Sequence, residues 1–202
     1  ASPAPTPDRL ARAERLVLEA ARSGAQLAVL PELFNTGYDY AASNYRRAEP
    51  PDGPTVAWMR ATASRLDLHL AGSLMLRDRG EIYNAFLLCG PDGRLWRYDK
   101  RCPWGWERAY FRPGRGVTVA DTDLGRIGML VCWDAAHPGL WRQYAGRVAL
   151  VLVCSCPPDA SNPVYHLPNG DRLTLQQLGP VMASTEGVGQ MVFGDMLNEQ
   201  VA

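Results

Sequence analysis

The stretch Gly125-Arg-Ile-Gly-Met-Leu-Val-Cys132-Trp-Asp134 predicts a buried β-strand that ends on a cysteine. The turn sequence Asp123-Leu-Gly-Arg126 separates this strand, expected over Ile127–Cys132, from an earlier strand over Val117–Asp121. Active sites are commonly built from loops at strand ends, so Cys132 is a candidate site residue.

The segments on the C-terminal side of this strand alternate between helix and strand. A helix is expected from about Pro138 to Gly146, and a buried strand at Val148–Cys154, where the residues are all apolar. Further along, we expect a helix around Leu173–Glu186 and a strand at Gln190–Gly194.

The segments on the N-terminal side begin with an amphipathic helix. Thr6 and Pro7 suit its start and Gly24 suits its end, with apolar residues at helical spacing between them. A short buried strand and a second helix are expected next, at Leu27–Leu30 and Pro54–Leu66. Three strands joined by turns that contain Asp and Gly are then predicted to form a meander: Leu68–Leu76, Ile82–Cys89 and Leu95–Asp99. Helices that alternate with hairpins and isolated buried strands indicate a layered α/β fold.

Length and composition restrict the class of protein. The 202 residues suit a single domain, 1–202, and the apolar fraction of 47% is ordinary for a soluble globular protein. Lys plus Arg and Asp plus Glu both number 21, so the net charge of zero argues against a nucleic-acid partner. We therefore expect a small-molecule substrate.

Apolar runs and cysteines indicate the setting of the protein. No run approaches the roughly 18–20 apolar residues of a membrane span, and the first residues lack the charged and apolar regions of a signal peptide. Five cysteines, an odd number, indicate a reducing, cytoplasmic setting. The chain lacks an initiator Met and opens almost directly into a helix, which is typical of a fragment.

Glu32, Lys100 and Cys132 share one property, because each follows or ends a predicted strand. Each also has an ordinary interpretation when it is taken alone. Glu32 fits an exposed loop carboxylate, Lys100 a solvated lysine at a strand end, and Cys132 an inert buried thiol. Their occurrence together favours one shared site.

Four separated blocks occur in a defined order: Pro31-Glu32-Leu-Phe with Gly37-Tyr38, Tyr98-Asp-Lys100, Phe111-Arg-Pro-Gly114, and Gly125-Arg-Ile-Gly128 running into Cys132-Trp-Asp134. Together they resemble the signature blocks of the nitrilase superfamily, the carbon–nitrogen hydrolases, over nearly the whole chain. The resemblance implies an α/β fold of the α-β-β-α sandwich type. It also implies a sandwich that is incomplete at both termini, since the first strand and the C-terminal part common in the family are missing.

The resemblance further implies a set of catalytic residues. Glu32, Lys100 and Cys132 match the family's Glu-Lys-Cys triad, and Glu107 matches a second glutamate beside it, a surface carboxylate being the alternative. Tyr38 and Trp133 lie in matched blocks and are the preferred substrate-binding residues, with ordinary packing as the alternative for each. No metal or organic cofactor is implied, and a homo-oligomer is expected by analogy.

These residue types fit nucleophilic catalysis. A free thiol has a pKa near 8.5 and is mostly protonated at neutral pH. A nearby Lys100 ammonium favours the thiolate, and Glu32 can accept the thiol proton. The Cys132 sulfur then attacks an amide or nitrile carbon, while Lys100 and the backbone N–H of Trp133 stabilise the developing negative charge.

Other residues limit what the resemblance implies about the substrate and argue against a metal site. Cys102, Ala135 and Gly139 stand where many relatives carry His, a larger polar residue and Glu, which leaves the substrate open. A zinc site would have to use Cys154-Ser-Cys156, His166 and Cys102, whose spacing is not a usual ligand spacing. His69 and His137 fit structural roles.

The leading prediction is therefore a hydrolase of a linear amide, carbamoyl amine or ω-amide. Among the proteins that the chain resembles, true nitrilases carry Glu where Asp134 follows Trp133, which favours amides here. The alternatives are a nitrilase that acts on a small nitrile, an inactive or truncated relative with only a binding or assembly role, and a metal-binding module.

Overall fold

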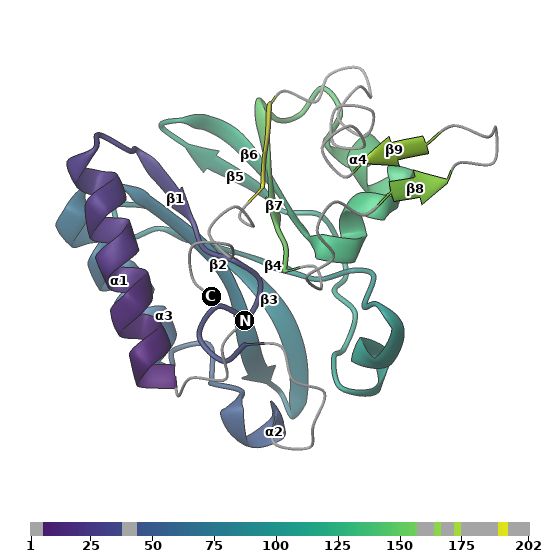
Figure 1. Cartoon of the computed structure of the whole chain (residues 1–202), viewed down its shortest axis with the longest axis horizontal. Coiled ribbons are helices and arrows are strands. Elements are labelled where there is room, and N and C mark those ends of the chain that lie inside the picture. The colour runs from purple at the N-terminus through teal and green to yellow at the C-terminus, as the bar shows by residue number, and fades with distance from the viewer. Residues whose placement is uncertain (1–5, 38–43, 157–163, 167–171, 175–189, 194–202) are drawn as a thin grey trace.

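The computed structural model of the protein describes residues 6–37, 44–156, 164–166, 172–174 and 190–193. The strands of its first sheet are β1 (Leu27–Val29), β2 (His69–Asp78), β3 (Glu81–Cys89) and β4 (Leu95–Asp99), in that order. The strands of its second sheet are β10 (Gln190–Phe193), β7 (Leu150–Cys154), β6 (Gly125–Val131) and β5 (Val119–Thr122). Helices lie outside both sheets, so the expected α-β-β-α sandwich is confirmed (Figure 1).

Helices α1 (Thr6–Arg22) and α3 (Pro54–Leu66) cover the outer face of the first sheet (Figure 1). Helix α1 ends where Gly24 adopts a φ of +84°, a conformation that costs glycine little. Val17 of α1 and Met59 of α3 are buried, and both pack in a cluster with Leu74 and Leu87 of the sheet. The apolar stripes seen in the sequence therefore face the first sheet, as expected.

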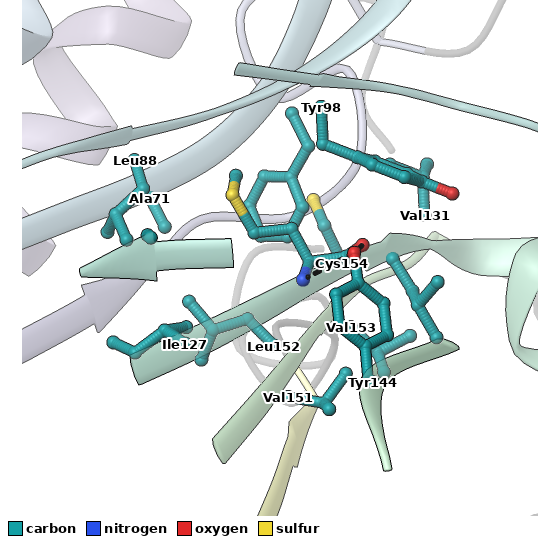
Figure 2. Packing of buried hydrophobic residues seen from close by; sticks show 14 of the residues in the cluster. Ala71, Leu88, Tyr98, Ile127, Val131, Tyr144, Val151, Leu152, Val153 and Cys154 are labelled. Atoms are coloured by element: carbon teal, nitrogen blue, oxygen red, sulfur yellow. Dashed lines mark hydrogen bonds between the residues drawn. The ribbon is translucent and has the colours of Figure 1, made fainter. Parts of the chain in front are cut away.

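The alternation of side chains along β2 and β3 divides the interior into two cores. Leu74 and Leu87 face the helices, whereas Ala71, Phe86 and Leu88 point to the other side and pack with the second sheet (Figure 2). This second core also contains Ile127 of β6 and Val151, Leu152 and Val153 of β7. The two sheets are thus held face to face by one continuous apolar layer.

Helix α4 (Pro138–Tyr144) closes the outer side of the second sheet through Tyr144. A Cβ atom on Gly128 would lie 2.8 Å from the Tyr144 ring, so glycine is needed for the helix to approach the strand this closely. The Tyr144 hydroxyl accepts the N–H groups of Met129 (3.2 Å) and Thr118 (3.3 Å) and donates to the Met129 carbonyl at 2.7 Å. It satisfies backbone groups of β6 beyond the end of its pairing with β5.

Most predicted elements agree with the structure to within three residues at each end. One is wrong at its start: a helix was expected around Leu173–Glu186, but Leu173 lies in β9 (Arg172–Thr174). There its backbone pairs with β8 (Val164–His166), which removes those peptide groups from any helix. The remainder of that expected helix lies outside the described residues, as does Gly194.

Five short elements among the described residues were not predicted: α2 (Asn44–Arg47), η1 (Gly105–Ala109), η2 (Cys132–Ala136) and the strands β8 and β9. Each is too short to show a repeating apolar pattern. None of the helices in the described ranges combines the length and the apolar character needed to cross a lipid bilayer.

The Tyr144→Phe substitution tests the role of the buried hydroxyl. Removing the hydroxyl leaves the Met129 N–H and carbonyl without this partner, so the free energy of unfolding should fall by about 1–3 kcal/mol, measured by urea denaturation. Tyr83→Phe is the matched control, because the Tyr83 ring would keep its contact with the Arg97 guanidinium. Equal stability of the two variants would contradict the assignment.

Candidate active site

The ends of four strands from both sheets meet at one place. Glu32 follows β1, Lys100 follows β4, Cys132 follows β6 and Ser155 follows β7. Two contacts join the sheets here: the Glu32 N–H points to the Ser155 carbonyl at 3.5 Å, and the Cys154 thiol donates to the Leu30 carbonyl at 3.2 Å. Residues distant in the chain therefore form one cluster.

The centre of the cluster is a buried ammonium between two carboxylates. Lys100 Nζ lies 2.9 Å from Glu32 Oε1 and 2.8 Å from Glu107 Oε2. Lys100 is 1% exposed, Glu32 2% and Glu107 0%. The surface alternatives for Glu32, Lys100 and Glu107 are therefore wrong.

The two oxygens of Glu32 are in different surroundings. Oε1 accepts hydrogen bonds from Lys100 Nζ at 2.9 Å and from Asn84 Nδ2 at 2.8 Å. Oε2 is buried and has no hydrogen-bond partner among the described residues. A buried carboxylate oxygen without a donor is unfavourable, and it is available to accept a proton.

Glu107 is held by its own short helix. It lies in η1, and its Oε2 accepts the N–H of Trp104 at 2.5 Å. Burial, together with the charge of Glu32, raises the pKa of Glu107 to about 8, while the Trp104 N–H favours the carboxylate. Glu32, Lys100 and Glu107 therefore share their protons as one group.

Lys100 remains charged in these surroundings. Burial is the largest single effect and acts against its ammonium form, but the charges of Glu32, Cys132 and Asp134 and the hydrogen bond to Glu32 together raise the pKa of Lys100 above its ordinary value. Its backbone is also fixed, because its N–H donates to the Asn84 carbonyl and its carbonyl accepts the Gly114 N–H, both at 2.9 Å. At Gly114 a Cβ atom would lie 2.0 Å from the Asp99 carbonyl oxygen, so only glycine fits there.

Cys132 is the first residue of η2 and lies at the sharp turn that follows β6. Its φ of 45° is in the left-handed region, which is strained for a residue other than glycine. Burial, reinforced by the charge of Glu32, raises the pKa of the Cys132 thiol to about 12, against the opposite effect of Lys100. A hydrogen bond with the Ser155 side chain also favours the thiolate without reversing this shift.

Asp134 connects the Cys132 turn to the loop after Lys100. Its Oδ1 accepts the Cys102 N–H at 2.7 Å, and its Oδ2 accepts the Val131 N–H at 3.1 Å and the Tyr98 hydroxyl at 2.8 Å. The Arg101 N–H donates to Oδ1 at 3.1 Å. One fully buried carboxylate thus orders the chain on both sides of the site.

The comparisons with known proteins identify the family of this chain. A family model described as carbon-nitrogen hydrolase matches residues 3–177. This chain belongs to the carbon–nitrogen hydrolase family. The curated relatives of this carbon–nitrogen hydrolase agree with that conclusion. A nitrilase of Pyrococcus abyssi is 32% identical over 151 residues, and an omega-amidase NIT2 of Danio rerio is 31% identical over 157 residues.

Each of the two matches covers 72% of this chain. They cover 58% and 56% of the two relatives, so this chain spans less than two thirds of the length of either relative. XC1258 of Xanthomonas campestris, described as a CN-hydrolase superfamily protein with an arsenic adduct in its active site, has a similar structure. Its TM-score is 0.70 at 30% identity, covering 78% of this chain and 62% of that one. An amidase from Nesterenkonia sp. has a TM-score of 0.78 at 22% identity, covering 96% and 72%, and shows the fold alone.

The structure of this chain brings Glu32, Lys100 and Glu107 into direct contact and places Cys132 within their electrostatic influence. Their catalytic roles remain predictions. Trp133 is 40% exposed, with its ring edge-on to His137, and its role in binding is likewise a prediction. Tyr38 lies outside the described residues.

Ser73, Asn84 and Ser155 contact the site and were not predicted. Ser73 and Asn84 interrupt strands that are otherwise almost wholly apolar, and a polar residue on a core-facing position of such a strand was the signal available. No group of three or more His, Cys, Asp or Glu residues in the described ranges is placed to hold a metal. His69 is buried with Nε2 3.2 Å from Asp123 Oδ1, and His137 Nδ1 contacts the Trp133 carbonyl at 2.9 Å, as their structural interpretation predicted.

The raised pKa of Cys132 changes one expectation from the sequence. Lys100 favours the thiolate, but burial and Glu32 outweigh it, so the Cys132 side chain is a neutral thiol near neutral pH. Because its pKa of about 12 lies above the ordinary value near 8.5, Cys132 should stay protonated from about pH 7 to pH 10.

The thiolate absorbance in the ultraviolet measures this directly. The difference between wild type and Cys132→Ser should show no step over that range in the folded protein. The same two proteins in denaturant should show a step near pH 8.5. A step below about pH 9 in the folded pair would refute the neutral thiol.

Proposed function

We propose that this chain hydrolyses a non-peptide carbon–nitrogen bond of a small amide or carbamoyl amine through a thioester on Cys132. The observation that carries the proposal is the buried Oε2 of Glu32, which has no hydrogen-bond partner among the described residues, in the same cluster as a half-buried, neutral thiol. A neutral thiol is a weak nucleophile and requires a base at the moment of attack. Glu32 has one oxygen held and one available for that task.

In the proposed reaction, the Cys132 proton passes to Glu32 Oε2 as the sulfur–carbon bond forms. The carbonyl π electrons move to oxygen, and the resulting oxyanion is stabilised by Lys100 and the backbone N–H of Trp133. The C–N bond then breaks, and Glu32 returns its proton to the leaving nitrogen. Water attacks the thioester with Glu32 as base, which releases the acid and restores the thiol. The net reaction is amide plus water to acid plus ammonia or amine.

Glu107 supports this scheme through Lys100. Both Glu107 oxygens lie within 3.0 Å of the ammonium, so Lys100 does not depend on Glu32 alone for charge compensation. When Glu32 becomes protonated during the reaction, Glu107, whose pKa is raised to about 8, can release its own proton and then balances the ammonium. Lys100 can therefore remain positive at the step at which the oxyanion forms.

The setting of the activity is proposed on the sequence and the relatives together. We propose one catalytic domain over 1–202, a cytoplasmic location and a homo-oligomer. All five cysteines are free, which agrees with a reducing environment. A nitrile is the second substrate class, since one relative is a nitrilase and the sulfur attack is the same on a nitrile carbon.

Cys132→Ala tests the nucleophile. Turnover should fall at least about 10³-fold because no other group replaces the sulfur, while the unfolding transition stays cooperative. The measurement is release of ammonia or amine from a panel of amides, carbamoyl amines and nitriles. Cys89→Ala is the matched control, since that thiol is fully buried, also has a pKa raised by burial to about 12 and lies in the helix-side core. Full turnover by Cys132→Ala would overturn the proposal.

Glu32→Gln tests the base separately. The amide cannot accept the thiol proton, so kcat/KM should drop by about 10²–10⁴-fold on the same substrate. Glu14→Gln is a surface control, because Glu14 forms an exposed ion pair with Arg65. Unchanged turnover in Glu32→Gln would assign the base to another group.

A further inference from the structure

Two polar residues are buried on the inner face of the first sheet, Ser73 of β2 and Asn84 of β3. Both are fully or almost fully buried, on the face that carries Ala71, Phe86 and Leu88. The β2–β3 register pairs Ser73 with Phe86 and Asn84 with Met75, so the two polar residues are diagonal neighbours. Burying a hydroxyl and an amide in an apolar layer is costly unless both are hydrogen-bonded.

Their hydrogen bonds run in one direction. The Leu33 N–H donates to Ser73 Oγ at 2.9 Å, and the Ser73 hydroxyl donates to Asn84 Oδ1 at 2.9 Å. The Asn84 amide then donates through Nδ2 to Glu32 Oε1 at 2.8 Å. A hydroxyl has a single proton, and Ser73 gives it to Asn84, so the NH₂ group of the amide faces Glu32.

The hydrogen-bonded pair Ser73 and Asn84, called the relay below, contacts two adjacent residues, Leu33 and Glu32. It accepts the backbone N–H of Leu33, whose φ of 50° is in the left-handed region, and it donates to the side chain of Glu32. The Phe34 N–H donates to the Ser73 carbonyl at 3.2 Å, which anchors the same loop to β2. The backbone of residues 33–34 and the carboxylate of Glu32 are thus both held by β2 and β3.

The relay also determines which oxygen of Glu32 is occupied. Asn84 and Lys100 both donate to Oε1, which leaves Oε2 without a donor among the described residues. Without Asn84, the carboxylate would be free to turn and offer both oxygens to the ammonium. The charged or titratable groups that act on this region are Lys100, Glu107, Cys132, Asp134 and Cys154.

We propose that Ser73 and Asn84 are positioning residues that keep Oε2 of Glu32 free to take the Cys132 proton. The inference rests on the proposed function, because it assigns the orientation of the base used there. Neither residue touches the reacting atoms. Their effect should therefore be seen in the efficiency of proton removal and only when Glu32 is present.

Alkylation of Cys132 by iodoacetamide is the test, because it requires loss of the thiol proton but no turnover. The sulfur–carbon bond forms as iodide leaves, and the proton passes to Glu32. Asn84→Ala should slow alkylation at neutral pH by about 10- to 100-fold, the effect of losing a hydrogen bond to a charged group. Ser73→Ala, which removes one oxygen and keeps the amide, should slow it by about threefold to tenfold.

The dependence on Glu32 separates positioning from general damage. In a Glu32→Gln background, adding Asn84→Ala should cause no further slowing, because the base whose orientation it sets is already lost. Further slowing in the Glu32→Gln background would overturn the proposal.

Asn35→Ala is the matched control. Asn35 is another buried amide that donates to a carboxylate, Glu49 Oε1 at 3.2 Å, and also to Thr55 Oγ1 at 3.1 Å. Its loss should lower stability but keep the alkylation rate within about twofold of wild type. If Asn84→Ala does not fold, Ser73→Ala decides: a wild-type rate in that folded variant refutes the relay. Failure of the relay can be distinguished from failure of the proposed function, because the proposed function fails only if Cys132→Ala retains turnover.

Discussion

The contact of Lys100 with Glu32 and Glu107 is the constraint to which the surrounding structure conforms. Two carboxyl groups are buried within 3.0 Å of the Lys100 ammonium, and the cost of removing charges from water is recovered only with good geometry and further hydrogen bonds. Asn84 and the Trp104 N–H supply those bonds to the carboxylates. The end of β4 cannot shift without disturbing all of these groups.

The sandwich fold brings strand ends of the two sheets to one point, where this cluster forms. Glu32 and Lys100 come from the first sheet, and Cys132 and Ser155 come from the second. Asp134 binds backbone groups on both sides of that division, from Val131 to Cys102. The apolar core between the sheets therefore fixes the relative position of Glu32 and Cys132 (Figure 2).

Much of this arrangement could be predicted from the sequence because its signals are local. Periodic apolar residues predicted α1 and α3, and the ordered blocks around Glu32, Lys100 and Cys132 predicted which residues meet. The relay of Ser73 and Asn84 could not be predicted in this way, because it depends on the register of β2 against β3. The ionisation of Cys132 was also out of reach, since its sign follows from a balance between burial, Glu32 and Lys100 that exists only in the folded chain.

The high pKa of Cys132 has a consequence for chemical durability. Peroxides and other oxidants attack thiolates far faster than thiols, and each oxidation step beyond the sulfenic acid is hard to reverse. A thiol that stays protonated at neutral pH spends little time in the vulnerable form. The burial that raises the pKa of Cys132 should therefore also slow the oxidation of its sulfur.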